Sequence, residues 1–284
     1  MKIRFWGVRG SIASPGPHTA RVGGNTSSVE VECGSAHFLL DAGTGLRSLG
    51  EDLLARNVDP NLTLLLSHYH WDHIQGLPFF APAYLPQTKI TIIGGANGLM
   101  SVRQALQQQM SAPVFPVRLD ELRAEIQTRE VQSGQSFDVG DARVRVLRLN
   151  HPGGVFAYRI DCEGSSVVYA TDTEHYACVD PALRALCDGA DVLIYDSQYT
   201  PEEYAGKVGP SKVGWGHSTY VAGADLAKAA GVGQYVMFHH DPKRTDKEVL
   251  ELQRITRMLF PPTIAAREGL VLELQRRKRG TKAA

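Results

Sequence analysis

The segment from His68 to His73 holds the densest group of side chains that could take part in chemistry, because four of its six residues can bind a metal ion. It follows the apolar run 61–67, which is typical of a buried parallel strand that leads into a loop. Such a turn can direct two imidazoles at one cation, and a carboxylate with an imidazole at a neighbouring cation. A lone histidine is usually solvated or packed in a core, but this ordered cluster predicts a metal site.

Further metal-binding side chains follow other predicted strands. His151, Asp172 and His239 each come directly after an apolar strand, as His68 does. In layered α/β folds, ligands gather where strand ends meet loops at one edge of a sheet. We therefore expect these four residues to converge on one shared site. The four strands are predicted at 61–67, 143–149, 166–170 and 234–238.

Strand-like and helix-like patterns alternate along the whole chain, without repeats or long linkers. This pattern predicts one α/β domain over residues 1–284, with 276–284 as a flexible tail. Leu46, Leu49, Leu53 and Leu54 have the spacing of an amphipathic helix over 45–56. The remaining elements are predicted as strands at 2–8, 28–33, 37–41, 89–93, 155–160, 192–195 and 270–274, and as helices with the face Leu99, Val102, Leu106 and Met110, at 219–230 and at 247–259.

The bulk composition excludes several classes of protein. The 284 residues carry 30 basic and 30 acidic side chains, so a general polyanion-binding surface has no support. No apolar stretch has the length of a membrane span or the form of a signal peptide. The four cysteines form no C-x-x-C pair and are expected to be reduced thiols. These features predict a cytoplasmic protein that does not enter membranes.

The motifs together resemble the metallo-β-lactamase superfamily over nearly the whole chain. The resemblance rests on the 68–73 segment, the isolated His151, Asp172 in Ala170-Thr171-Asp172, and a late histidine after a strand. It implies an αββα four-layer sandwich, with two mixed sheets face to face and helices outside. It also implies two divalent cations, zinc before manganese or iron given the imidazole-rich donor set.

The resemblance also implies which side chain binds which ion. The first ion takes His68, His70 and His151. The second takes Asp72, His73 and a histidine of the segment 238–242, with Asp172 bridging both ions. His239 directly follows the strand and is preferred, but His240 stays open because adjacent residues at a strand end point in opposite directions.

Such a pair of cations, about 3.5–4 Å apart, lowers the pKa of a shared water and supplies metal-bound hydroxide at neutral pH. Asp72 and His217 are the predicted catalytic residues. His217 lies in 216–219, which resembles the H-S-T segment of the ribonuclease Z-like branch, where the imidazole assists the phosphoryl or leaving oxygen. Four residues are predicted to bind substrate: Asn25, Thr26, Ser27 and His240.

The predicted substrate is a small cyclic nucleotide or a related phosphodiester. Only a tight hairpin lies between His151 and Asp172, which leaves no room for the basic arm of the bacterial tRNA enzymes. Nucleic acid is therefore disfavoured as a substrate, although an RNA 3′-end endonuclease stays open, as does a homodimer. A thioester or lactone hydrolase of the glyoxalase II type and a non-catalytic protein with structural zinc also stay open. Asp196 is expected to orient a metal-bound histidine, and Arg9 or Ser11 to contact substrate.

Overall fold

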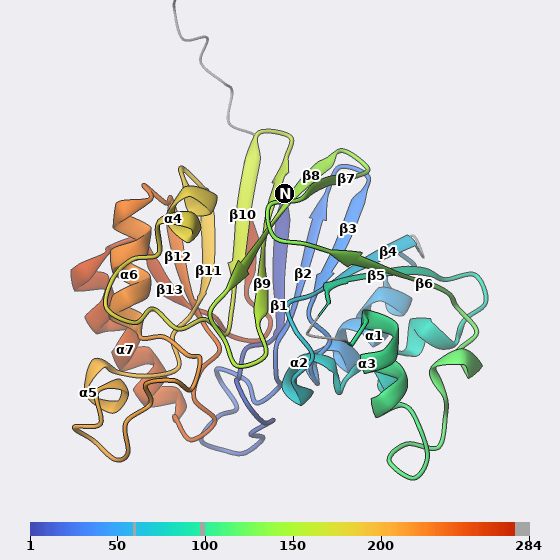
Figure 1. The fold of residues 1–284 in the computed structure, drawn as a ribbon, viewed down its shortest axis with the longest axis horizontal. Helices are drawn as coiled ribbons and strands as arrows, with labels where there is room; N and C mark the ends of the chain where they lie inside the picture. The colour runs from blue at the N-terminus through green and yellow to red at the C-terminus, as the bar shows by residue number, and fades with distance from the viewer. Residues whose placement is uncertain (59–60, 97–99, 276–284) are drawn as a thin grey trace, which may run out of the picture.

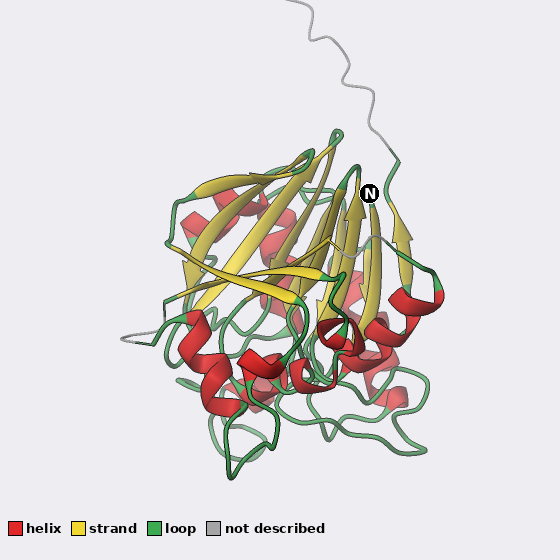
Figure 2. Cartoon of the chain, turned by 90° about the vertical axis from the view of Figure 1, so that its right-hand side faces the viewer, coloured by secondary structure: helices red, strands yellow, loops and turns green. Residues whose placement is uncertain are grey.

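The computed structural model describes residues 1–58, 61–96 and 100–275 and arranges them around two seven-stranded sheets. Figure 1 shows the sheets next to each other with helices on their outer sides. Figure 2 shows that loops and several helices gather at one end of the strands. The predicted tail at 276–284 and the first residue of the second predicted helix, Leu99, lie outside the described residues.

The first sheet has the strand order β14-β1-β2-β3-β4-β5-β6. Its strands β3 to β6 run parallel to one another, whereas β2 pairs antiparallel with both β1 and β3. Strands β1 and β3 therefore run in the same direction and end at the same edge. The bounds are β1 Lys2–Gly7, β2 Ser28–Cys33, β3 Ala36–Leu40, β4 Asn61–Leu66, β5 Lys89–Gly95, β6 Glu125–Val131 and β14 Val271–Glu273.

The second sheet has the order β13-β12-β11-β10-β9-β8-β7, with β10 to β13 parallel. Because β9 is antiparallel to both β8 and β10, these two strands also end at one edge. Both sheets are thus mixed, as predicted. The bounds are β7 Ser136–Val139, β8 Ala142–Leu149, β9 Val155–Cys162, β10 Ser165–Ala170, β11 Val192–Asp196, β12 Gln234–Phe238 and β13 Thr263–Ala265.

Three apolar cores show why the chain forms four layers. One core lies between the sheets and contains Phe38 of β3 and Phe238 of β12. A second packs the outer face of the first sheet on α1, and a third packs the second sheet on α4 and α6. The predicted αββα sandwich is confirmed. The helices are α1 Gly45–Ala55, α2 Trp71–Ile74, α3 Val102–Gln109, α4 Pro181–Cys187, α5 Pro201–Tyr204, α6 Tyr220–Ala229 and α7 Asp246–Leu259, with 3₁₀ turns η1 Leu77–Phe79, η2 Ala81–Tyr84 and η3 Leu119–Glu121.

The sequence pattern identified the buried elements well and the edge strands poorly. Helix α1 buries Leu46, Leu49 and Leu53 as expected, although Leu54 is exposed. Strands β6, β7 and β13 were not predicted; all three lie at sheet edges, β13 has only three residues, and β6 and β7 each bury only one side chain fully. Without an apolar face to bury, an edge strand gives little periodic signal in the sequence.

One prediction about the cysteines was wrong. Cys33 at the end of β2 and Cys162 at the end of β9 form a disulfide between the two sheets, with their Cα atoms 6.3 Å apart. The pair is separated by 129 residues, so no local spacing could reveal it. Cys178 and Cys187 are free thiols. Among the described residues, no helix has the length and apolar character needed to cross a bilayer.

Candidate metal centre

The predicted ligands converge at the edge where both sheets end. His68 follows β4, His151 follows β8, Asp172 follows β10 and His239 follows β12. Asp172 and His239 adopt the left-handed backbone conformation, with φ of 51° and 59°. Non-glycine residues rarely adopt this conformation, and where they do it often marks a functional site. The turns after the strands thus hold these side chains in unusual but defined directions.

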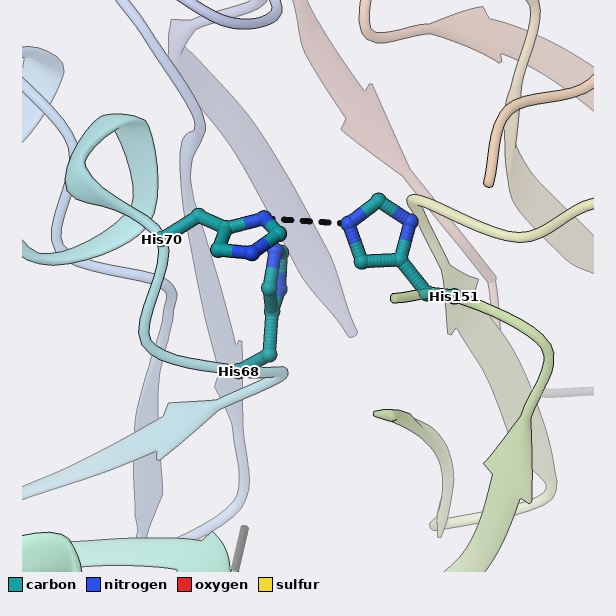
Figure 3. Close-up of side chains that lie close together, drawn as sticks. All are labelled: His68, His70 and His151. Atoms are coloured by element: carbon teal, nitrogen blue, oxygen red, sulfur yellow. Dashed lines mark hydrogen bonds between the residues drawn. The ribbon is translucent and has the colours of Figure 1, made fainter. Parts of the chain in front are cut away.

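Three imidazoles form the first cluster, which Figure 3 shows in close-up. His68, His70 and His151 place their ligand nitrogens within 4.8 Å of one another. His70 precedes α2 at the rim of the site and its Nδ1 lies 3.0 Å from His151 Nε2. The Nε2 atom of His68 is buried and has no hydrogen-bond partner among the described residues. A buried polar atom without a partner is costly unless a ligand satisfies it.

Two carboxylates and two imidazoles form the second cluster. His73 and His239 bring their Nε2 atoms to 3.3 Å from each other, and both lie 3.2 Å from Asp72 Oδ2. Asp172 Oδ1 lies 3.3 Å from His73 and 3.1 Å from His239. Its other oxygen, Oδ2, faces the first cluster, 3.7 Å from His68 and 3.9 Å from His151. Asp172 therefore stands between the clusters, with one oxygen toward each.

These distances fit cations rather than direct hydrogen bonds between the ligands. Two atoms that each lie 2.0–2.1 Å from a tetrahedral zinc ion are roughly 3.3 Å apart. The second cluster shows this spacing for several pairs that include His73 and His239. A donor set of imidazoles and carboxylates suits zinc and also admits manganese or iron. The two clusters can thus hold a pair of divalent ions that share Asp172.

The opposite nitrogen of most ligand imidazoles has a defined partner. His73 Nδ1 donates to Asp41 Oδ2 over 2.7 Å, and Tyr169 donates to the same oxygen. His239 Nδ1 donates to Gln198 Oε1, and His151 Nδ1 to the carbonyl oxygen of Gly216. Such partners fix the tautomer and the ring orientation of a metal ligand.

Asp41 and Gln198 were not identified as ligand partners from the sequence. Asp41 did carry a usable signal in the sequence, because it is a carboxylate directly after the apolar run of β3 at the same edge. Gln198 also lies just beyond a strand, β11, but a side-chain amide is not a usual metal ligand and did not mark it out.

The turn after β1 supports the second cluster from the N-terminal end of the chain. The Ser11 N–H donates to Asp72 Oδ2 over 2.7 Å. Gly10 lies against His239, and a Cβ at this position would be 2.3 Å from the ring atom Cε1. Arg9, predicted as a substrate contact, is fully buried and donates to the carbonyl oxygens of Gly23, Asp241 and Arg244. The prediction for Arg9 was therefore wrong, because its guanidinium ties backbone segments together and does not reach the site.

His217 faces the same cavity from the N-terminal side of α6. Its Nδ1 lies 2.8 Å from Asp196 Oδ2, and its ring stacks on His239. Asp196 was predicted to orient a metal ligand, but its close histidine partner is His217, whereas His239 Nδ1 is 4.0 Å away. A hollow of about 430 Å³ opens over this group and is lined by Trp71, Asp72, Asp172 and His217, among others. The predicted catalytic residues Asp72 and His217 thus border one cavity.

Burial and charge set the protonation of the ligands. Burial lowers the pKa of His68 well below its usual value, which keeps the ring neutral and able to bind a cation. Burial opposes charge on His73 as well, but Asp172 and Asp72 outweigh it and raise the pKa of that ring. Burial would raise the pKa of Asp172, yet His239 and His73 hold it well below the usual range. For His217, Asp196 outweighs burial and raises the pKa to about 9.

The four predicted substrate residues do not face the cavity. Asn25 bonds through its side chain to Glu268, and Thr26 Oγ1 accepts the backbone N–H of Thr44. Ser27 is fully buried, and His240 donates to the carbonyl oxygen of Ala266. His240 is therefore also turned away from the ligand cluster that His239 joins. The geometry gives these four residues a structural role, and no contact here supports substrate binding by them.

Comparison with known proteins agrees with this geometry. A family model described as a beta-lactamase superfamily domain matches residues 36–240. The chain belongs to the beta-lactamase superfamily. Within it, the chain is 24% identical over 314 aligned residues to the protein named ribonuclease Z from Methanopyrus kandleri, covering 96% of this chain and 98% of the relative.

Two solved structures of this superfamily fold have similar architecture. The metallo-beta-lactamase fold protein YhfI from Bacillus subtilis superposes with a TM-score of 0.72 at 20% identity, covering 95% of this chain and 98% of that one. The short form of human tRNase Z gives 0.68 at 20% identity and covers 97% and 100%. At these identities the likeness shows the fold alone. Fold and superfamily together make this chain a metallo-β-lactamase-fold hydrolase.

Proposed function

We propose that this protein is a phosphodiesterase that cleaves nucleotide phosphodiester bonds at a two-metal centre. The observation that carries the proposal is the position of Asp172, which directs one carboxylate oxygen at each ligand cluster. A shared carboxylate reduces the repulsion between two cations held close together. When bound, two such cations lower the pKa of a shared water and stabilise the oxygens of the substrate.

The residues of the chain supply the remaining parts of the reaction. Asp72 and Asp172 provide fixed negative charge for the second ion, and the Ser11 N–H holds Asp72 in place. The Nδ1–H group of His217 donates a hydrogen bond to Asp196 Oδ2. Nε2 is therefore the ring nitrogen that remains free to contact the substrate. From the wall of the cavity it can donate a proton to the departing oxygen. We assign to His217 the role of general acid.

RNA is the substrate that the similar proteins favour. The relative named ribonuclease Z aligns over nearly the whole of both chains, so the sequence-based preference against nucleic acid finds no support there. A small phosphodiester is the second candidate. The structure favours it at one point, because β9 and β10 are joined by a two-residue turn at Glu163 and Gly164, without an arm that could hold tRNA.

A substrate panel tests the proposal on zinc-loaded protein. We expect hydrolysis of bis-p-nitrophenyl phosphate, abolished by chelation and restored by zinc, because the chemistry requires the ions. Precursor tRNA and 2′,3′-cyclic AMP then separate the two candidate substrates. Turnover of S-lactoylglutathione without any phosphodiester cleavage would contradict the proposal and favour a thioesterase. Metal binding without turnover of either class would indicate structural zinc.

A further inference from the structure

A second hollow, of about 470 Å³, lies next to the first ligand cluster. Its wall includes His151, whose Nε2 meets His70 at the rim of the first hollow. The two hollows therefore lie on either side of the His70–His151 pair. A substrate with its scissile phosphate at the ligand clusters can extend into this second hollow. None of the residues predicted to bind substrate lines it.

Arg148 gives this hollow a positive charge that no carboxylate of the described residues neutralises within 4.0 Å. Its neighbours on β8 differ, since Arg143 pairs with Asp138 and Arg145 with Asp161. The guanidinium of Arg148 lies across Gly154, where a Cβ would be 2.8 Å from Nε and Nη2. The φ of Gly154 is 92°, a conformation that favours glycine. Local backbone geometry thus makes room for an exposed, unpaired cation beside the site.

Gly214, which also lines the hollow, belongs to a glycine-rich loop, residues 205–216, that a buried carboxylate holds in place. Glu174 accepts the N–H groups of Gly214 and Gly216 and the hydroxyl of Tyr204. These three donors hold the carboxylate of Glu174 toward the loop, and it makes no ion pair with Arg148 within 4.0 Å. The loop carries an exposed Trp215, 52% accessible, with Lys212 Nζ 3.8 Å above its ring.

Tyr176 completes the hollow with an exposed aromatic ring, 53% accessible. An aromatic face and a nearby guanidinium are the two groups that bind a base and a phosphate in single-stranded nucleic acids. Arg148 offers a planar fork that matches a phosphate with two hydrogen bonds. The hollow therefore has the chemistry of a nucleotide subsite and not of a purely apolar ligand pocket.

We propose that the hollow lined by Arg148, Tyr176 and Gly214 binds the nucleotide that flanks the scissile phosphodiester, with Arg148 on its second phosphate and Tyr176 on its base. The proposal rests on the proposed phosphodiesterase function and specifies its substrate class. A substrate with a flanking phosphate fits this subsite, whereas a cyclic mononucleotide has no group for Arg148. One or two local cations suit a short strand or its end better than a long duplex.

Two nucleotides that differ by one phosphate test the subsite. Calorimetric titration of zinc-loaded protein with adenosine 3′,5′-bisphosphate and with adenosine 5′-monophosphate gives the ratio of the two Kd values. We expect the bisphosphate to bind about tenfold more tightly, as one added charge-assisted contact implies. Arg148→Gln brings the ratio close to one. Arg143→Gln, on the same strand and also exposed, is the matched control and keeps the ratio.

A second variant separates the base from the phosphate. Tyr176→Ala weakens binding of both nucleotides by about tenfold and leaves their ratio unchanged, because both carry the same base. Equal binding of the two nucleotides by the wild-type protein, or an unchanged ratio in Arg148→Gln, overturns the subsite even where bis-p-nitrophenyl phosphate is cleaved. A preserved ratio without any phosphodiester cleavage instead overturns the proposed function and leaves the subsite standing.

Discussion

Two regions of this protein bury carboxylates, and they balance the negative charge in different ways. On the outer side of the first sheet, Glu30 of β2 is fully buried and bonds to Arg4, Arg56 and His37 at 2.9, 2.5 and 2.8 Å. At the ligand clusters, Asp172 is equally buried, but its ion-pair partners among the described residues are all imidazoles, which carry charge only when protonated, and Thr171 adds a neutral hydroxyl donor. Arginine stays charged at any pH that a folded protein meets.

This difference shows which region depends on a cation from outside the chain. Glu30, Glu32 and His37 lie close enough together to hold an ion, but guanidinium groups already contact the carboxylates of Glu30 and Glu32. Burial would raise the pKa of Glu30, yet His37 and Arg56 hold it well below the usual range. The Glu30 network is therefore complete as it stands. The carboxylates of the ligand clusters are arranged for divalent ions.

The first prediction removes the carboxylate that both clusters share. Asp172→Ala lowers the rate on bis-p-nitrophenyl phosphate by about 100-fold or more, because the variant loses the carboxylate that would position both ions for the reaction. Elemental analysis of the variant should show less than two metal equivalents. Asp138→Ala, which removes an exposed carboxylate of β7, is the control and keeps both activity and metal. An Asp172→Ala protein with wild-type rate would refute the role given to this residue.

The second prediction concerns the network that needs no metal. Glu30→Gln lowers the free energy of unfolding by about 2 kcal/mol, since the variant leaves partly buried arginine donors without their carboxylate. Urea unfolding should give the same loss with zinc and with a chelator. A loss that appears only with zinc would mean that the two regions are not independent. Glu51→Gln, an exposed partner of Arg47 on α1, should cost less than about 1 kcal/mol.

The same variant has a defined pH dependence. Because the folded-state pKa of Glu30 lies below the unfolded value, its contribution to stability is present above the unfolded pKa of about 4.3. The contribution is lost as the pH falls from there toward the folded-state pKa. The stability difference between the wild type and Glu30→Gln should therefore be constant from about pH 7 to 5 and shrink below about pH 4. A difference that grows in acid would contradict this.

The sequence was informative where ligands are local or follow regular strands. The 68–73 segment needed no tertiary knowledge, and His151, Asp172 and His239 could be placed because parallel strands end at one edge. The alternation of apolar strands and amphipathic helices predicted an α/β domain, whereas its αββα layers were implied by the resemblance to the superfamily. These features depend on periodicity and on short spacing, which a single sequence displays directly.

The supporting residues were out of reach because they act over long distances in the chain. Gln198 meets His239 from 41 residues away, and the Ser11 N–H meets Asp72 across 61 residues. A backbone N–H leaves no trace in the residue type, and Arg148 looks like any other arginine of a strand that alternates arginine with apolar residues. Only the tertiary structure shows that its neighbours on β8 are paired with acids and that it is not.

The last prediction tests one such long-range support at Gly10. A Cβ in Gly10→Ala would lie 2.3 Å from His239 Cε1, so the imidazole must move away from the second cluster. We expect about tenfold weaker binding of one of two zinc ions, the range seen when ligand support is lost. Competition with a chromophoric chelator measures this affinity, and urea unfolding of the metal-free protein verifies that the variant folds.

Gly16→Ala is the matched control in the same N-terminal loop, because the nearest atom to its Cβ would be 4.0 Å away. It should bind both ions as the wild type does. If Gly10→Ala also binds both zinc ions with wild-type affinity, His239 is a ligand of neither ion. If both ions are weakened equally, the clusters respond as one unit through Asp172, because that carboxylate contacts His239 on one side and faces His68 on the other.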